Sequence, residues 1–188
     1  MSGTAEVHPD AILTPGKLEL LAAWLPRQSW FAGDAADLKK VARFRFVDPD
    51  NEVGLETLLV SSGGVTYQVP LSYRAEPLDD AEDYLIGTMD HSVLGKRWVY
   101  DATGDPVYVD ELIRVIREGD HQAALSTGAE TMKVEGSGAV LIANSSGTTR
   151  LARVLDEQHK LPRNVVGNLT GFWVEDGNER TAVLATLH

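Results

Sequence analysis

One segment constrains the fold more than any other in this chain, the run VTYQVPLSYR at Val65–Arg74. Apolar or aromatic residues alternate strictly with smaller or polar ones along it, which is the period of a strand with one buried face. Gly63 and Gly64 precede this run, and the apolar run Leu55–Val60 comes before them. Glycine pairs between two such runs are typical of hairpin turns, so we expect an antiparallel hairpin. Pro70 has no backbone N–H to donate, so it predicts an edge position or a bulge in this strand.

Further strand signals lie on both sides of this hairpin. Residues 40–47 place Phe44 and Phe46 on one face, and a turn at 48–51 follows. Asp176-Gly177 stands between two alternating runs and is a strong hairpin signal. The other predicted strands are 97–101, 131–134, 139–143, 148–155, 165–174 and 180–187.

The first of two predicted helices covers residues 15–25. Thr14 is a suitable N-cap, and Pro15 would occupy the first helical position, where its missing N–H costs nothing. Leucine and alanine side chains follow at helical spacing. Pro26 ends this helix, because the residue before a proline is pushed out of the helical region.

The second predicted helix begins at Asp105-Pro106, a capping residue followed by proline. Its apolar positions follow the helical period, and Gly119 ends it. The acidic segment at 78–90, which precedes it, fits either a short helix or a polar loop.

These elements together predict an α+β fold, with antiparallel β-sheet and two main helices. Strands that follow one another through hairpins favour antiparallel pairing, and the helices are set apart from them. Residues 1–13 are polar and mixed, and we expect a flexible arm there. The rest divides into an α+β region at 14–118 and a hairpin-rich region at 119–188, which is equally compatible with one continuous domain.

Charge and composition exclude several classes of protein. The 17 Lys and Arg against 28 Asp and Glu give a net charge of −11, which would repel nucleic acid and anionic membranes. The absence of cysteine excludes disulfides, thiolate zinc sites and cysteine nucleophiles. No apolar run approaches the roughly 18 residues of a membrane span. The first ten residues lack the basic and apolar regions of a signal peptide, so we expect a cytoplasmic protein.

Three motifs stand in order along the first two-thirds of the chain. They are WLPRQSWFAG at Trp24–Gly33, YQVPL at Tyr67–Leu71, and HSVLG followed by VYDATGDP within His91–Pro106. In order and spacing they resemble the N-terminal cap of the actinobacterial maltokinases, over roughly residues 14–118. The resemblance implies a helix packed on an antiparallel sheet, loosely cystatin-like, and a link to maltose, trehalose or glycogen metabolism. Asp34 stands where that family tends to carry a basic residue.

The resemblance does not imply kinase activity. Phosphoryl transfer needs a catalytic-loop Asp and metal-binding carboxylates in set patterns. The chain contains neither a His-x-Asp segment followed by the catalytic-loop Asn nor an Asp-Phe-Gly-like triplet. It also ends at His188, before a kinase C-lobe could be built. We therefore expect a stand-alone, non-catalytic cap-like protein.

Other polar patterns have simpler structural explanations. The Asp48–Gly54 segment has calcium-loop spacing, but strands flank it, which favours a β-turn. Residues 135–139 are glycine-rich but lack the spacing of a phosphate-binding loop. The acidic run at 79–83 is expected to be a solvated face. The five histidines are widely separated, so no metal site, catalytic base or cofactor is expected.

The remaining candidates for contact are aromatic residues and the polar tip of the WLPRQSWFAG corner. Trp24 and Phe31 are expected to be in the core. A pocket between helix and sheet, lined by Trp30, Tyr67 and Trp98, could stack against a sugar. Alternatively, the corner could contact a protein.

Three functions follow from these features. The first is a non-catalytic regulatory or interaction module, whose partner is a protein of α-glucan metabolism or a second copy of the chain. Arg27 and Gln28 would be its polar contacts beside Trp30. The second is a small-molecule or glycan-binding protein that uses the helix–sheet pocket. The third, an enzyme without a recognisable motif, has no acid, base or nucleophile pattern in its support.

Overall fold

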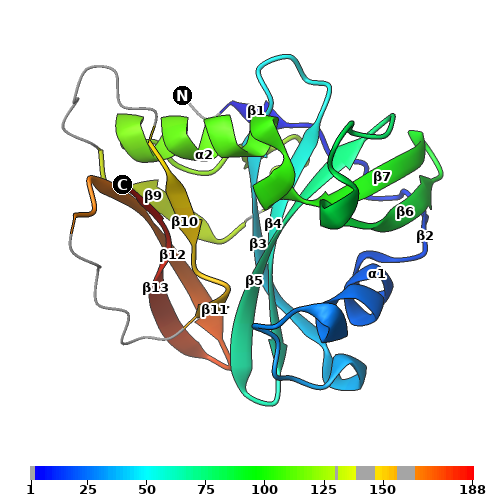
Figure 1. The fold of residues 1–188 in the computed structure, drawn as a ribbon, viewed down its shortest axis with the longest axis horizontal. Helices are drawn as coiled ribbons and strands as arrows, with labels where there is room; N and C mark the ends of the chain where they lie inside the picture. The colour runs from blue at the N-terminus through cyan, green and yellow to red at the C-terminus, as the bar shows by residue number, and fades with distance from the viewer. Residues whose placement is uncertain (1–2, 130, 139–146, 156–163) are drawn as a thin grey trace.

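A seven-stranded antiparallel sheet separates two layers of the molecule (Figure 1). The computed structural model describes residues 3–129, 131–138, 147–155 and 164–188. Within these residues, helix α1 (Lys17–Trp24) lies on one face of the sheet. Helix α2 (Pro106–Glu118) and a four-stranded sheet lie on the other. The predicted α+β fold with antiparallel sheets is confirmed.

The large sheet has the strand order β2-β6-β7-β5-β4-β3, with β11 pairing to β5. The smaller sheet has the order β10-β13-β12-β9, and β1 pairs with β8 in parallel. The strands are β1 (Thr4–Ala5), β2 (Leu13–Thr14), β3 (Lys39–Val47), β4 (Gly54–Ser62), β5 (Val65–Arg74), β6 (Leu85–His91), β7 (Gly95–Asp101), β8 (Ala124–Leu125), β9 (Lys133–Gly136), β10 (Thr149–Leu151), β11 (Val154–Leu155), β12 (Gly167–Glu175) and β13 (Asn178–Leu187). Short 3-10 turns lie at Leu25–Arg27, Ala35–Asp37, Glu82–Tyr84 and Ala102–Gly104.

Both predicted hairpins are confirmed. Strands β4 and β5 join at Gly63 and Gly64, which have φ values of 59° and 79°. Strands β12 and β13 join at Asp176 and Gly177, with φ values of 50° and 78°. Two successive positive φ values twist the connection in the same sense as the strands it joins, which is why glycine and aspartate occupy these turns.

The edge position or bulge predicted from Pro70 is wrong, because β5 lies inside the large sheet and pairs with β4 without a shift in register. β4 pairs with the whole of β5 on one side. On the other side, β11 pairs only as far as Tyr67, and β7 begins at Leu71. The backbone N–H of Gln68 points to this second side, where it donates to Arg153. Backbone groups two residues apart point the same way, so the missing N–H of Pro70 falls in the gap between β11 and β7.

The predicted start of the first helix is also wrong by two residues. Thr14 pairs with Asp90 as part of β2 and cannot cap the helix. Gly16 is the N-cap instead, and the Glu19 side chain accepts its backbone N–H at 2.6 Å. The helix ends at Trp24, and Pro26 lies in the 3-10 turn that follows, as the stop signal predicted.

The caps predicted for the second helix are confirmed. Asp105 is the N-cap of α2 and accepts the N–H of Val107 at 3.1 Å, with Pro106 in the first turn. Gly119 ends the helix in the left-handed conformation, with φ of 65°. The segment at 78–90, expected to be a short helix or a polar loop, holds a 3-10 turn and then the strand β6. Only Ile86 and Met89 are buried in β6, so its apolar alternation is too sparse to recognise. The strand predicted at 139–143 lies outside the described residues.

Two hydrophobic clusters hold the layers together, one on each face of the large sheet. The first joins α1 to β4, β5, β6 and β7. The second joins α2 and the smaller sheet to β3 and β4, and it contains Phe44 and Phe46, as their alternation predicted. This second cluster draws on residues before and after position 119, including Leu169 and Leu184.

Replacement of Asp105 by alanine should destabilise the fold strongly. The residue is fully buried and forms two 2.7 Å hydrogen bonds with the Arg74 guanidinium besides capping α2. Loss of the cap and of one partner of a buried ion pair predicts a fall of about 3 kcal/mol in the free energy of unfolding. Urea denaturation measures this fall. Asp110→Ala, at an exposed position of the same helix, is the control and should change stability by no more than about 0.5 kcal/mol. Equal denaturation midpoints for the two variants would contradict this role of Asp105.

Candidate functional site

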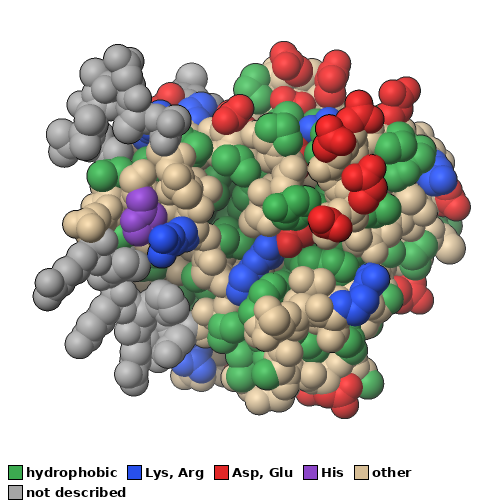
Figure 2. Space-filling model, viewed as in Figure 1, with side chains coloured by type: hydrophobic (Ala, Val, Ile, Leu, Met, Phe, Trp, Pro, Cys, Tyr) green, Lys and Arg blue, Asp and Glu red, His purple; other side chains and the backbone are tan. Residues whose placement is uncertain are grey.

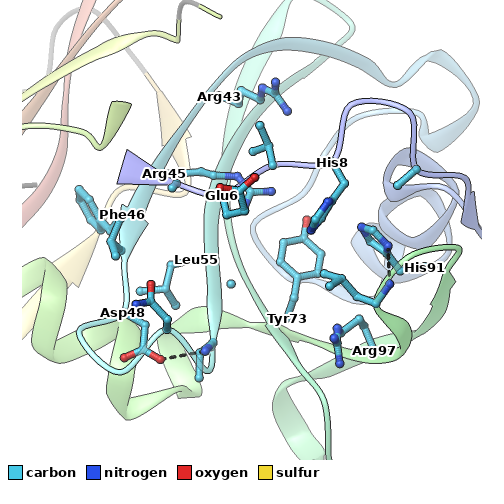
Figure 3. Close-up of a pocket in the computed structure, with 18 of the residues that line it drawn as sticks. Glu6, His8, Arg43, Arg45, Phe46, Asp48, Leu55, Tyr73, His91 and Arg97 are labelled. Atoms are coloured by element: carbon cyan, nitrogen blue, oxygen red, sulfur yellow. Dashed lines mark hydrogen bonds between the residues drawn. The ribbon is translucent and has the colours of Figure 1, made fainter. Parts of the chain in front are cut away.

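A cavity of about 690 Å³ lies beside one end of the large sheet, close to the β3–β4 turn (Figure 3). Residues 5–13 line one side of it, as the chain passes from β1 to β2. The opposite side consists of β3, the β3–β4 turn and Tyr73 of β5, with His91 and Arg97 from β6 and β7. Its volume is in the range of pockets that enclose small organic ligands.

A fully buried carboxylate, Glu56, lies beneath the wall of this cavity. Its oxygens accept hydrogen bonds from Lys17 and from the Tyr73 hydroxyl at 2.8 Å. Arg43 and Arg45 approach the same carboxylate at 3.3 and 3.6 Å. Burial alone would raise the pKa of Glu56, but Lys17 and Arg45 outweigh it and lower the pKa from 4.5 to about 2. Glu56 is therefore ionised at neutral pH.

The register of the β3–β4 hairpin brings these groups together. Arg45 pairs directly with Glu56 across the two strands, and Arg43 lies two residues further along the same face. Alternation along residues 40–47 puts both arginines on the face opposite Phe44 and Phe46, but it does not connect them with Glu56. A turn at 48–51 would place Arg45 opposite Gly54, but the connection runs from residue 48 to residue 53, and this longer connection brings Glu56 opposite Arg45. The contribution of Lys17 from α1 depends on packing, and no sequence signal indicates it.

Burial and the charge of Glu56 shift the pKa values of Lys17 and Tyr73 at this wall. Burial lowers the pKa of the Lys17 ammonium, although Glu56 acts in the opposite direction. Burial, and then Glu56, raises the pKa of the Tyr73 hydroxyl well above 10. The Tyr73 hydroxyl therefore stays neutral and donates a hydrogen bond to the Glu56 carboxylate. Lys17 also lies 5.4 Å from the centre of the Tyr73 ring.

Two histidines face each other at the cavity. The ring centres of His8 and His91 are 5.6 Å apart in an edge-on arrangement (Figure 3). The Nδ1 atom of His91 accepts backbone N–H groups of Val93 and Leu94 at 3.2 and 3.1 Å. Burial, followed by the nearby His8 and Arg97, lowers the pKa of His91. The imidazole is therefore neutral at pH 7, with its proton on Nε2.

The turn at Asp48 is structural, as its sequence predicted. The Asp48 carboxylate accepts the backbone N–H groups of Asp50, Glu52 and Val53 at 2.8–3.1 Å. These bonds use the oxygens that a calcium ion would need. Among residues 3–129, 131–138, 147–155 and 164–188, no group of three or more His, Cys, Asp or Glu side chains is arranged to hold a metal.

The acidic run before β6 is exposed, as predicted. Asp79, Asp80, Glu82 and Asp83 all lie at the surface. Figure 2 shows acidic side chains along the upper edge of the drawn face, over the β3–β4 turn and the segment that leads into β6. Asp79, Asp80, Glu82 and Asp83 contribute to solubility and do not line the cavity.

The WLPRQSWFAG corner packs against β5. The Trp30 ring lies 5.9 Å from the Trp24 ring and 6.2 Å from the Tyr67 ring. Trp24 and Tyr67 are buried, and Trp30 is partly exposed. The Arg153 guanidinium lies 5.0 Å from the centre of the Trp30 ring. The structure thus brings Trp30 and Tyr67 together.

The polar tip of the corner lies at the surface. Arg27 is exposed, and the Gln28 amide donates to the Trp24 carbonyl at 3.5 Å. Gly33, at the end of the corner, allows a close approach to β4. A Cβ atom there would lie 2.6 Å from the Ser62 hydroxyl. Asp34 caps the next 3-10 turn by accepting the N–H of Ala36.

Trp98 lies on the other face of the large sheet from Trp30 and Tyr67. It neighbours Val99 in β7, whose side chain belongs to the α1 cluster with Tyr67. Successive side chains of a strand point to opposite faces, so Trp98 points away from that cluster. Its ring contacts Lys96, whose ammonium lies 4.6 Å from the ring centre. The three aromatic residues do not form one pocket, and the role of each in contacting a ligand or partner stays a prediction.

Comparisons with known proteins identify part of this fold. Residues 24–105 match the maltokinase N-terminal cap domain. This cap segment begins at Trp24 in the corner, contains β3–β7, and ends at Asp105, the N-cap of α2. The chain is therefore consistent with a maltokinase N-cap-like protein, and the match suggests a link to maltose or α-glucan metabolism. The match is to a cap domain, and no kinase domain is found. A search of curated proteins finds no match.

The cap segment supplies only part of the cavity. Arg43, Arg45, Tyr73, His91 and Arg97 belong to it. Residues 5–13 and Lys17 precede it, and residues 127 and 129 follow it. In the part of the chain that the structure describes, no helix has the length and apolar character needed to cross a membrane.

Acid should destabilise the protein through Glu56. The pKa of this group is about 2 in the folded state against 4.5 ordinarily, so its contribution is complete above about pH 5 and is lost as pH falls towards 2. This difference corresponds to about 3 kcal/mol, measured by urea denaturation at a series of pH values. Glu56→Gln should flatten this dependence, whereas Glu76→Gln, at an exposed position, should leave it intact.

If Glu56→Gln does not fold, the wild-type carboxyl provides the test. Its ¹³C resonance should keep the ionised shift until well below pH 4. A carboxyl that titrates near 4.5 in the folded protein would contradict the compensation by Lys17 and Arg45.

Trp30→Ala should lower the free energy of unfolding by about 2 kcal/mol, because the ring packs against Trp24, Tyr67 and Arg153. Arg27→Ala, at an exposed position in the same corner, should change it by no more than about 0.5 kcal/mol. Thermal and urea unfolding measure both. A Trp30→Ala protein as stable as the wild type would show that packing does not require this ring.

Proposed function

We propose that this chain is a non-catalytic, ligand-binding module with a role in maltose or α-glucan metabolism. The observation that carries the proposal is the cavity of about 690 Å³ between the N-terminal residues and the cap segment. Its wall presents hydrogen-bond donors and aromatic or aliphatic surface together, which is the usual lining of a small-molecule site. The cap-domain match supports the metabolic link.

The non-catalytic part of the proposal rests on the residues of this chain. The sequence holds neither of the kinase patterns that phosphoryl transfer requires. At the cavity, the buried carboxylate Glu56 is compensated by Lys17 and two arginines, so it is a poor general base. Asp48 is engaged by backbone amides. His91 accepts two backbone N–H groups on Nδ1.

Regulation through a protein partner is a second role that the corner supports. Arg27 is exposed, and Gln28 and Trp30 are partly exposed beside it. The proposed partner is a protein of α-glucan metabolism or a second copy of this chain. Affinity capture from the native host, with Arg27→Ala as the weakened bait, tests this role. Recovery of no α-glucan enzyme by the wild-type bait, together with a monomeric mass in solution, would contradict it.

A thermal-shift panel tests ligand binding. Maltose, trehalose, maltose phosphate and nucleotides are each added to the wild-type protein. A ligand present at about 100 times its Kd stabilises the folded state by about 2.7 kcal/mol, so its melting temperature rises. We expect a saccharide or its phosphate to produce this rise. Flat curves for the whole panel would remove the proposed function.

A cavity-filling variant shows whether the cavity is responsible. Ala11 lines it and is partly buried, so Ala11→Trp should fill part of the space and abolish the shift. Ala23→Trp is the matched control, because Ala23 is exposed on α1 and does not line the cavity. If both variants kept the shift, the ligand would bind elsewhere.

A further inference from the structure

We infer that the cavity binds a small organic anion, and that a phosphate or carboxylate group of the ligand meets its cationic side chains. The inference rests on the proposed ligand-binding function and adds the chemical class of the ligand. The observation behind it is the number of positive groups around this cavity in a chain whose net charge is −11.

The inner wall has more positive than negative charge. Lys17, Arg43 and Arg45 line the cavity and share one carboxylate, Glu56. The Glu56 side chain is fully inaccessible, whereas the three cationic side chains keep exposed fractions of 22%, 33% and 16%. A ligand therefore meets the cations and not the carboxylate. Two positive charges remain at this wall after Glu56 is counted.

Arg45 has an unused donor. Its buried Nε atom has no hydrogen-bond partner among the described residues. A buried N–H group without a partner is unfavourable, so this side chain keeps hydrogen-bonding capacity that Glu56 does not use. The same side chain lines the cavity and stays 16% exposed, so a bound oxyanion meets the accessible part of the Arg45 guanidinium.

The β6–β7 side adds another cation. Arg97 lines the cavity and forms one long hydrogen bond, 3.4 Å, to the carbonyl of its neighbour Lys96. Among the described residues, no carboxylate lies within ion-pair distance of Arg97. His8 and His91 lie close by, and both Arg97 and Lys17 act on the charge of His91. His8, His91 and Arg97 come from the N-terminal residues, β6 and β7, and they converge around Tyr73 (Figure 3), whose ring centre lies 5.4 Å from the Lys17 ammonium.

The acidic residues of the lining do not cancel this charge. The Asp48 carboxylate is held by three backbone N–H groups, and Figure 3 places it across the cavity from His91 and Arg97. Glu6 accepts the Ser126 hydroxyl at 3.1 Å. Glu52 is exposed in the β3–β4 turn. The Asp48 carboxylate thus lies apart from His91 and Arg97, which leaves the β6–β7 side of the cavity suited to the anionic end of a ligand.

The size of the cavity requires more than an inorganic ion. A volume of about 690 Å³ far exceeds that of a phosphate ion and suits a body of sugar size. Leu13, Val53 and the Tyr73 ring supply apolar surface beside the cations. An organic phosphate or carboxylate with a sugar-sized body fits this combination.

Calorimetric titration with matched probes tests the inference. Glucose 1-phosphate and glucuronate carry the two oxyanions on a sugar body, glucose is the neutral control, and inorganic phosphate is the bare ion. All are measured at one pH and one ionic strength. We expect one of the two sugar anions to bind more tightly than glucose by at least tenfold, and more tightly than inorganic phosphate.

Arg97→Gln locates the binding. This residue is partly exposed and forms no ion pair in the described structure, so its replacement should leave the fold intact, as far-UV circular dichroism will verify. Loss of one charged hydrogen bond should weaken binding of the sugar anion roughly tenfold. Arg150→Gln is the matched control, because it makes the same charge change at an exposed position of β10 outside the cavity. It should bind as the wild type does.

The histidine ring signals of the wild-type protein give a second readout of where the anion binds. The chain has five histidines, so their ring signals can be assigned in a proton–nitrogen spectrum with His8→Gln and His91→Gln. Titration of the wild type with glucose 1-phosphate or glucuronate should shift the signals of His8 and His91, and leave that of His121 in place.

The outcomes separate this inference from the proposed function. If glucose or maltose binds as tightly as the sugar anions, the anion class is wrong and ligand binding stands. If no probe and no member of the thermal-shift panel binds, both are wrong. Equal losses for Arg97→Gln and Arg150→Gln, or unmoved His8 and His91 signals, would overturn the assignment of the anion to this cavity.

Discussion

The arrangement of α1 and the central strands depends on the ion pairs and the hydrogen bond that the buried Glu56 carboxylate makes. The carboxylate connects Lys17 of α1, the arginines of β3 and Tyr73 of β5 through one point in β4. Removing an ion from water is costly, and only several well-placed donors offset that cost. Side chains alternate between faces of a strand, so a slip of β4 by one residue would place Glu56 among the apolar side chains of the α2 face. The charge of Glu56 thus selects one register of the β3–β4 pair and one position of α1.

The same cluster explains why the cavity is cationic in an acidic protein. Most carboxylates lie at the surface, whereas Lys17, Arg43 and Arg45 are drawn inwards by Glu56. The N-terminal residues then cover them. Those residues are held by two short strand pairs, β1 with β8 and β2 with β6, and by a hydrogen bond from Val7 to Ser126. Fewer hydrogen bonds hold residues 5–13 than hold the long strands beneath them. Local opening of this segment therefore requires less free energy than unfolding of the sheet.

The sequence predicted the elements well where local chemistry decides them. The glycine pair at 63–64, the Asp176-Gly177 turn and the caps at Asp105 and Gly119 each require a particular backbone geometry, and each is where it was expected. The predictions from Thr14 and Pro70 were wrong because strand partners distant in sequence decide the positions of these two residues. The cavity was missed for a similar reason. Lys17, Arg45, Tyr73 and His91 are spread over 75 residues of sequence, and no local pattern indicates that four elements bring them together.

The match to a cap domain covers most of the large sheet and little of the layers on its two faces. Residues 24–105 supply β3–β7, whose α1 face packs against the N-terminal helix and whose other face carries Phe44, Phe46 and Leu59. A sheet with apolar side chains on both faces must be covered on both.

In this chain, α2 and the smaller sheet provide the second cover, with Leu169 and Leu184 in the same cluster as Phe44. Arg153 adds a polar connection, since it hydrogen-bonds Asp101 and lies over Trp30. The segment after Gly119 therefore completes the core that the cap segment begins. Without the segment after Gly119, the cap segment of this sequence could fold stably only if another surface covered the face of β3 and β4 that carries Phe44.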